Sequence, residues 1–310
     1  MLLTFIGPAA AFDDLDRPAP DAGVEEGDFV WSQVTVSGTG TNGAGGATPL
    51  SSRDTTWVPP VCWLQPLHTP EEFAELMADE RAHSGSAQAD WLAEIRAVDY
   101  HQGEDGHWWG VVHNQHLPEE QARAECSLRA GNPQWVEAGG EPPTADAVGP
   151  EMLAEVAYAA TRLPPPQATL RPPPDAQRVN LDVHVALAAD ALPGRVTTTA
   201  SMDHLGVRFA ATVVAVPREL RVEAGTEYAD PAVCEYRLDG SEVDTAGADC
   251  NVTYRRDSGE AGYPLRVELT WDVHWTASAD SDGAVAEVLP DGFTASEQQV
   301  TVREIQTVVR

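Results

Sequence analysis

The final third of the chain alternates between apolar and polar side chains. Across residues 265–276 every odd-numbered residue is apolar and every even-numbered residue is polar. Because a β-strand points successive side chains to opposite faces, this pattern predicts a strand with one face in a core and the other in water. The predicted core residues are Leu265, Val267, Leu269, Trp271, Val273 and Trp275.

The same two-residue rhythm begins near residue 177. Residues 179–187 and 205–215 alternate in this way. Further strand candidates are 195–200, 218–223, 233–238, 249–255 and 298–309. Roughly eight strands without a helical pattern between them predict an antiparallel β-sandwich over residues 177–310.

Helical patterns are confined to the preceding part of the chain. Thr69, Pro70 and Glu72 predict a helix start, because threonine caps, proline suits the first helical position and glutamate completes a capping box. A second helix is indicated at 91–98 and a third from Pro118. Between these two helices, residues 100–114 predict a β-hairpin that turns at a Gly-Glu-Asp-Gly sequence. Residues 57–148 are therefore expected to form a small α+β module.

The flanking segments have distinct compositions. Residues 1–11 resemble the end of a secretory signal, with a short apolar core and three alanines but no basic residues before them. Residues 12–56 are acidic and then glycine-rich, which predicts disorder and a flexible tether, with a short strand at 29–36. Residues 149–176 predict a helix followed by a stiff spacer containing two runs of three prolines.

The charge balance restricts the class of partner. The chain has 49 acidic and 19 basic residues, a net charge of −30, and every basic residue is arginine. Such a charge repels nucleic acid and anionic membranes. No stretch has the roughly 20 apolar residues that a membrane-spanning helix needs. We expect neither a nucleic-acid partner nor a membrane span.

Four cysteines fit an oxidising exterior, since their number is even. Two lie in each half of the chain, which suggests the pairs Cys62–Cys126 and Cys234–Cys250, although other pairings stay open. The alternative is four buried thiols, as in a cytosolic protein.

A group of histidines is the main candidate for chemistry. His101, His107 and His113, with His116 beyond them, flank the predicted hairpin, and neutral imidazoles bind zinc well. Their spacing matches no standard metalloenzyme motif, so the competing interpretation is a polar hairpin edge. Nucleophile motifs such as Gly-x-Ser-x-Gly are absent from the sequence.

Adjacent tryptophans suggest a second kind of site. Trp108 and Trp109 must face opposite sides of a strand, so one of them is a candidate exposed platform for a carbohydrate or peptide ligand. The alternative is a small core that uses large side chains to bury enough area.

The C-terminal half resembles the polycystic-kidney-disease-type (PKD-like) immunoglobulin-like domain of secreted actinobacterial proteins. The resemblance rests on residues 250–254, on the Gly-Tyr step and long strand of 262–275, and on residues 302–306. The Gly-Asp-Gly turn of such domains is replaced by residues 221–227, so any role of that turn is in doubt for this chain.

The whole chain also looks like a group of uncharacterised exported actinobacterial proteins. The shared features are a glycine-rich tether, Cys62-Trp63, a Thr-Pro-Glu helix start and a Pro-Glu-Met-Leu helix at 150–153, and they cover residues 28–310. The resemblance implies a non-catalytic, secreted surface protein without a cofactor. Its expected work is attachment, scaffolding or binding of a cell-envelope protein or glycan, with a link to the cell wall or a surface appendage.

Two other functions compete with this expectation. One is a metal-dependent enzyme that uses the region from His101 to His116. The other is a nucleotide-binding protein, which is disfavoured because a phosphate-binding loop needs a lysine and the chain has none.

Overall fold

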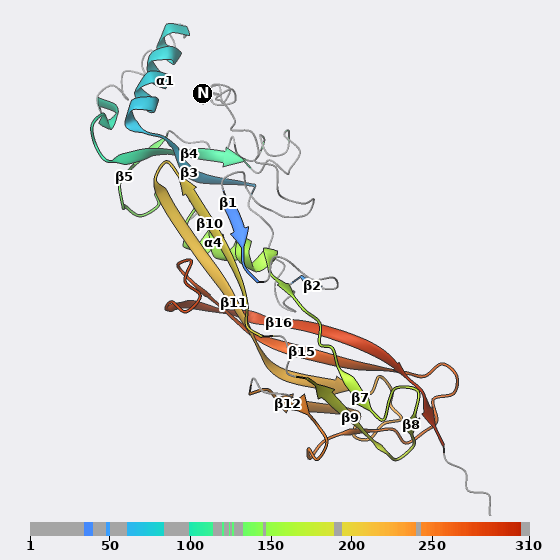
Figure 1. Ribbon diagram of the computed structural model, residues 1–310. Coiled ribbons are helices and arrows are strands. Elements are labelled where there is room, and N and C mark those ends of the chain that lie inside the picture. The colour runs from blue at the N-terminus through green and yellow to red at the C-terminus, as the bar shows by residue number, and fades with distance from the viewer. Residues whose placement is uncertain are drawn as a thin grey trace, which may run out of the picture. The chain divides into compact units, whose positions relative to one another are not determined.

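The computed structural model is dominated by antiparallel β-structure (Figure 1). It describes residues 34–39, 48–49, 61–83, 99–113, 120, 124, 126, 133–144, 147–188, 194–239 and 243–304. The predicted signal segment, most of the tether and the helix at 91–98 lie outside the described residues.

The chain forms two compact units. Unit one comprises residues 1–35, 58–156 and 200–210, and unit two comprises residues 36–57, 157–199 and 211–310. The predicted boundary at 148/149 falls within unit one, and the tip of a later hairpin, residues 200–210, also belongs to unit one.

Unit one contains a three-stranded antiparallel sheet and a helix. The sheet has the order β3 (Cys62–His68), β4 (Gly106–His113) and β5 (Gln134–Glu137). Helix α1 (Pro70–His83) begins as predicted: the amide of Glu72 donates to Thr69 Oγ1 at 3.2 Å, and the amide of Thr69 donates to Glu72 Oε2 at 2.8 Å. This capping box fixes the start of the helix directly after β3.

The predicted hairpin at 100–114 is wrong. Strand β4 pairs with β3 and β5, whereas Asp99–His101 form a short 3-10 turn, η2. Tyr100 and His101 have positive φ angles of 49° and 58°, which reverse the chain, and Trp108 Nε1 donates to the carbonyl of Tyr100 at 3.1 Å. The segment before β4 is therefore a turn that the Trp108 side chain stabilises, and β4 is the central strand between β3 and β5.

Most of unit two is built from two antiparallel sheets. The larger, six-stranded sheet has the order β1-β10-β11-β15-β16, with β12 also paired to β11. Its strands are β1 (Val34–Ser37), β10 (Val196–His204), β11 (Val207–Glu223), β12 (Val233–Arg237), β15 (Tyr263–Thr276) and β16 (Val285–Val300). In the smaller sheet, β9 (Asp182–Leu187) pairs with β7 (Thr169–Arg171), β13 (Val243–Asp244) and β14 (Val252–Thr253).

Short pairs of strands complete the described fold. Strand β8 (Gln177–Arg178) runs parallel to β17 (Val302–Arg303), and β2 (Thr48–Pro49) pairs with β6 (Arg162–Leu163). Helix α4 (Pro150–Ala160) confirms the helix predicted after residue 149. Within the described part of the chain, no helix is both long and apolar enough to cross a bilayer.

The alternation in β15 is confirmed on its apolar face. Leu265, Val267, Leu269 and Trp271 are 0% exposed, and Val273 and Trp275 follow at 1% and 5%. The polar face differs from the prediction, because Glu268, Thr270 and Thr276 are also buried. Glu268 forms an ion pair with Arg266 of the same strand, with the two atoms 2.6 Å apart. This ion pair offsets the cost of burying the Glu268 carboxylate.

Residues 205–223 depart from the predicted strands. Leu205 and Gly206 form the hairpin turn with positive φ angles of 52° and 80°, so Leu205 is not a strand residue. The two predicted strands that follow are one strand, β11, in which the pairing with β15 shifts between Pro217 and Glu219. A β-bulge of this kind lets a long strand pass a proline without ending.

The proline-rich segment is not a free spacer. Residues 164–176 include β7 and belong to unit two. Thr294 Oγ1 donates to the carbonyl of Pro164 at 3.2 Å, and Gln298 Nε2 donates to the carbonyl of Ala168 at 2.8 Å. Polyproline backbone leaves its carbonyls unpaired, and side chains of β16 bind them here.

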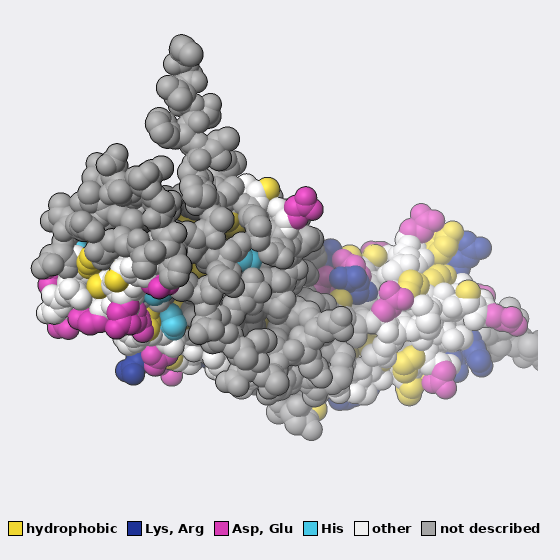
Figure 2. All heavy atoms as spheres, turned by 90° about the horizontal axis from the view of Figure 1, so that it is seen from above, with side chains coloured by type: hydrophobic (Ala, Val, Ile, Leu, Met, Phe, Trp, Pro, Cys, Tyr) yellow, Lys and Arg dark blue, Asp and Glu magenta, His cyan; other side chains and the backbone are white. Residues whose placement is uncertain are grey.

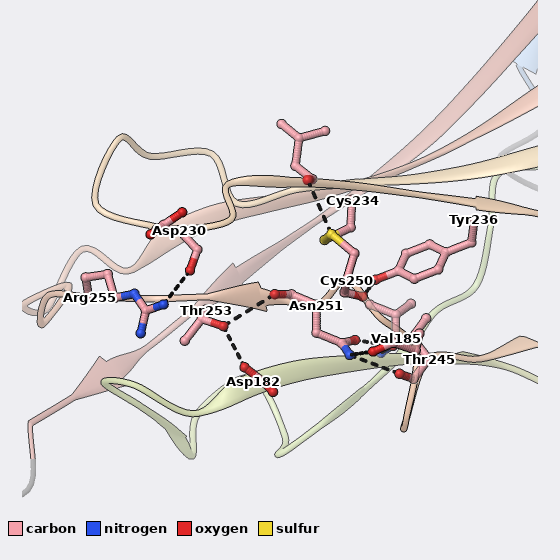
Figure 3. The surroundings of a disulfide bond; sticks show 12 residues. Asp182, Val185, Asp230, Cys234, Tyr236, Thr245, Cys250, Asn251, Thr253 and Arg255 are labelled. Carbon is pink, nitrogen blue, oxygen red and sulfur yellow. Dashed lines mark hydrogen bonds between the residues drawn. A yellow bond between two sulfur atoms is a disulfide. The ribbon is translucent and has the colours of Figure 1, made fainter.

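The disulfide Cys234–Cys250 is confirmed, and it lies beside a buried polar network (Figure 3). Thr245 Oγ1 donates to Asn251 Oδ1 at 2.7 Å, and Asn251 Nδ2 donates to the carbonyls of Thr245 and Ala248. The predicted Cys62–Cys126 bridge is wrong: both residues are buried thiols, and Cys126 Sγ lies 3.5 Å from the carbonyl oxygen of Val61.

Replacing both Cys234 and Cys250 with serine is expected to lower the stability of unit two by about 3 kcal/mol. The bridge spans a sequence separation of 16, and closing such a loop restricts the unfolded chain. Urea unfolding monitored by tryptophan fluorescence measures the change. Reductant should destabilise the native protein and leave the double variant unchanged; equal stability of the two proteins without reductant would refute the prediction.

Substituting Thr294→Val is expected to destabilise unit two by about 1–3 kcal/mol. The Thr294 hydroxyl accepts from Trp271 Nε1 at 3.0 Å and donates to Pro164, so valine leaves both buried groups without partners. A double-mutant cycle with Trp271→Phe isolates the bond between them. Additive effects of the two substitutions would show that this bond contributes nothing.

Candidate functional site

The histidines proposed as zinc ligands do not converge. His101 stacks on Trp135, with ring centroids 4.2 Å apart and an angle of 1° between planes, and its Nδ1 lies 2.9 Å from Glu104 Oε2. By strand alternation, the side chain of His107 lies on the face of β4 opposite to Trp108. His113 lies about 20 Å from His107 along the same strand. His116 lies outside the described residues, among which no group of His, Cys, Asp and Glu has a metal-binding arrangement.

The expected tryptophan platform is wrong, because both tryptophans are buried. Trp108 is 7% exposed and stacks on Phe73 of α1 at a centroid distance of 4.3 Å. Trp109 is 2% exposed and meets Phe209 edge-on at 6.4 Å. Both faces of β4 are covered, so each tryptophan ring is part of a core. This is the alternative interpretation, in which large side chains bury enough area for a small core.

A different group of titratable residues meets within unit one. His68 is the last residue of β3 and pairs with Trp108 of β4, on the face where both rings contact Phe73, whereas the side chain of His107 lies on the opposite face of β4. His204 comes from the tip of the β10–β11 hairpin and is electrostatically coupled to His68, to His107 and to Glu72 of α1. We call His68, His204 and Glu72 the histidine cluster.

The electrostatics of the cluster favour neutral imidazoles. Burial lowers the pKa of His68, the nearby Glu72 carboxylate opposes this effect, and repulsion from His204 lowers the pKa further. Burial likewise lowers the pKa of His204, against Glu72 and together with repulsion from His107. Among the described atoms, His68 Nε2 is buried without a hydrogen-bond partner, so a proton there would enter a site with no acceptor.

Glu72 stabilises the start of α1 in addition to its electrostatic effect on the histidines. Its Oε2 accepts the amide proton of Thr69 in the capping box. The carboxylate is therefore held at the helix start and is not free to follow either histidine.

Sequence reasoning missed this cluster because its members are far apart along the chain. The sequence predicts a role for Glu72 only in the helix start and singles out neither His68 nor His204 as a candidate ligand or catalytic residue. A hairpin from the C-terminal half brings His204 to a sheet formed by residues 62–137. No local spacing signals such a contact.

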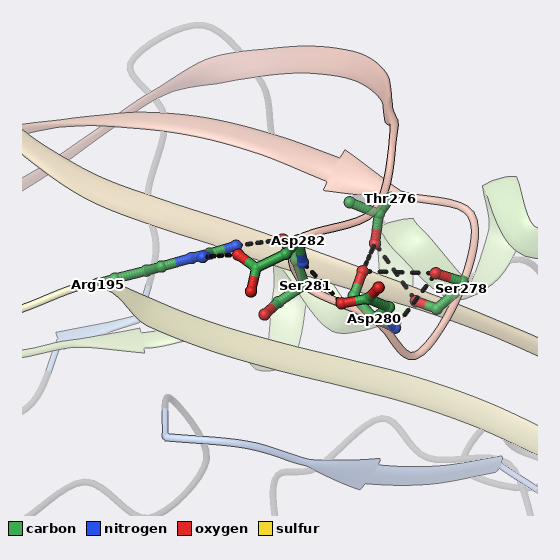
Figure 4. A network of polar contacts seen from close by, with 6 residues as sticks. All are labelled: Arg195, Thr276, Ser278, Asp280, Ser281 and Asp282. Atoms are coloured by element: carbon green, nitrogen blue, oxygen red, sulfur yellow. Dashed lines mark hydrogen bonds and ion pairs between the residues drawn. The ribbon is translucent and has the colours of Figure 1, made fainter.

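The acidic loop at residues 278–282 of unit two is held by a network of polar contacts (Figure 4). Thr276 Oγ1 donates to the carbonyl of Asp280 at 2.8 Å, and the amide of Asp282 donates to Asp280 Oδ1 at 2.9 Å. The guanidinium of Arg195 binds Asp282 and the carbonyl of Ser281. Arg195 thus compensates the charge of Asp282, and the Asp280 carboxylate accepts a backbone amide of the same loop.

The comparisons with known proteins add no identification: no family model matches the chain, and no curated protein or solved structure matches it.

Replacing Glu72 with glutamine is expected to lower the pKa values of His68 and His204. Glutamine preserves the capping-box hydrogen bond but removes the negative charge that raises both values. Titration of the histidine ring protons by NMR measures the change. Glu75→Gln, on the exposed side of the same helix, is the matched control; equal shifts in the two variants would contradict the coupling.

Proposed function

We propose that this chain is a secreted, non-catalytic surface protein that acts by contact, in attachment, scaffolding or ligand binding. The observation that carries the proposal is the Cys234–Cys250 disulfide within the β-rich unit two. Disulfides form and persist in oxidising environments such as the cell exterior. A β-unit cross-linked by a disulfide suits a protein that presents a rigid surface to a partner and catalyses no reaction.

The proposed architecture of unit two is an immunoglobulin-like sandwich of the PKD-like type. Supporting it, the larger sheet buries one face of β15, and the smaller sheet buries Val183, Val185 and Leu187 of β9. Two antiparallel sheets that each bury a row of alternate apolar side chains are the elements of a sandwich. The sequence resemblance to PKD-like domains covers β14, β15 and β17 of these strands.

The surface of unit two is ordered by arginine ion pairs. Arg221 Nε donates to Glu223 at 2.7 Å and its NH1 to Glu235 at 2.5 Å, while Glu268 lies opposite Arg221 on the neighbouring strand. Arg218 similarly binds Asp272 and Asp291. Networks of this kind fix the side chains of a sheet face more than isolated pairs do.

The charge of the chain narrows the proposed partner. Acidic side chains appear at several places among the described residues of the face shown in Figure 2, and the net charge of the chain is −30. An envelope protein or glycan that is neutral or basic approaches such a surface without the repulsion that an acidic polymer would meet. We propose no catalytic residue and no cofactor.

In intact cells of the source organism, the protein is expected to be digested by added protease and to have its Cys234 and Cys250 oxidised. Trypsin is suitable because every basic residue is an arginine, whereas lysine-directed surface labels have no side chain to react with. Blocking of thiols with a maleimide before and after reduction reports the bridge. Protection from protease combined with two reactive thiols at Cys234 and Cys250 would overturn the proposal.

A further inference from the structure

The first residues of β16 form an exposed apolar edge. Among the described strands, β16 is the last of the larger sheet and pairs with β15 alone. Residues 285–288 are all exposed, and Val285 and Val288 are 54% and 74% exposed. Within the described residues, no backbone hydrogen bond reaches this stretch from the side away from β15. Its outward N–H and C=O groups can therefore pair with an added strand.

The second half of β16 is already occupied. Thr294 and Gln298 donate to the carbonyls of Pro164 and Ala168, so the proline-rich segment of the chain itself lies against that half of the strand. The open stretch is thus limited to residues 285–288, about 13 Å of strand. A site of this length fits one extended polypeptide segment and not a broad protein surface.

A β-bulge places the two valines on one face. Val288 lies opposite His274 of β15, and Val285 lies opposite Thr276, so β16 has one extra residue in this stretch. His274 and Thr276 are two positions apart and share a face of the sheet, which their partners in β16 also share. Glu287, one position before Val288, projects from the other face.

Glu287 is the charge that this edge offers to a partner. The neighbouring carboxylates are paired, since Asp282 binds Arg195 and Asp291 binds Arg218 at 3.0 Å. No arginine of the described residues lies within ion-pair distance of Glu287. An opposed lysine or arginine on an added strand compensates this charge, whereas an opposed acidic residue is repelled.

We propose that residues 285–288 bind an extended segment of an envelope protein by β-strand addition, and that this segment carries a basic residue between β-branched apolar residues. The backbone of the segment pairs with the open edge of β16, its apolar side chains pack against Val285 and Val288, and its basic residue meets Glu287. This inference rests on the proposed function and names the kind of partner that the contact involves.

Titration of the isotope-labelled full-length protein with the synthetic peptide acetyl-Ser-Thr-Val-Arg-Val-Thr-Ser-amide, followed by NMR, tests the proposal. Amide signals of residues 285–288 should shift, with a Kd of about 1 mM or lower. The peptide with glutamate in place of arginine should bind about two- to fivefold more weakly, as expected for the loss of an exposed ion pair. Absence of shifts in this stretch at several millimolar arginine peptide would overturn the proposal.

Substitutions assign the binding to this edge. Val288→Ser should weaken binding of the arginine peptide, and Glu287→Arg should invert the preference between the two peptides. Both side chains are exposed, so these changes leave the fold intact. Val233→Ser on β12 and Glu297→Arg further along β16 are the matched controls, because both residues are exposed and lie outside the open stretch. An unchanged preference in the Glu287→Arg variant would also overturn the proposal.

Sedimentation of the protein alone distinguishes a partner segment from a second copy of the chain. A monomer is expected, because self-pairing would bring together two chains that each have a net charge of −30. A dimer that Val288→Ser disrupts would assign the edge to a second copy and refute the proposed partner. All of these measurements use purified protein, so their failure leaves the protease and thiol test of the proposed function unaffected.

Discussion

The burial of the apolar face of β15 is the constraint on which unit two depends. Its apolar face is closed to solvent from Leu265 to Trp275, and the strand pairs with β11 on one side and β16 on the other. A slip of one residue in either register would turn every one of these side chains to the opposite face. The indole of Trp271 adds a directional restraint, because its N–H needs Thr294, and Thr294 in turn needs the carbonyl of Pro164. Burial and hydrogen bonding thus specify the same register.

The elements that sequence predicted best were those with a strong local signal. The capping box at Thr69 and Glu72 and the alternation of 265–275 both depend on residues within a few positions of one another. The Cys234–Cys250 pair could also be predicted from the sequence, since the two residues are close in the chain. Long strand β16 was missed over most of its length because its Pro-Asp-Gly sequence at 290–292 is typical of a turn. In the structure this sequence coincides with a register shift against β15, so the strand bends and continues.

The features that sequence could not supply are those made by distant segments. The strand that pairs with β4 comes from residues 62–68 and not from the neighbouring 99–101, because positive φ angles at Tyr100 and His101 turn the chain away. The metal hypothesis assumed a hairpin there, and the platform hypothesis assumed that one face of a strand is exposed. Both depended on side chains that the folded unit buries or separates. His204 belongs to unit one only through the hairpin tip 200–210, an arrangement that no spacing of residues encodes. Tertiary pairing, not local pattern, decided each of these cases.

The parallel pairing of β8 with β17 has a mechanical consequence. Strand β8 stands near the start of the C-terminal part of unit two and β17 near its end, and Val179 and Thr301 add backbone hydrogen bonds beside the two strands. Tension applied at these two points pulls parallel neighbours past one another in shear, so their hydrogen bonds share the force and must break together. Hydrogen bonds in a peeled hairpin, by contrast, break one after another. The segment of unit two between β8 and β17 is therefore closed in a geometry that resists extension between these two strands.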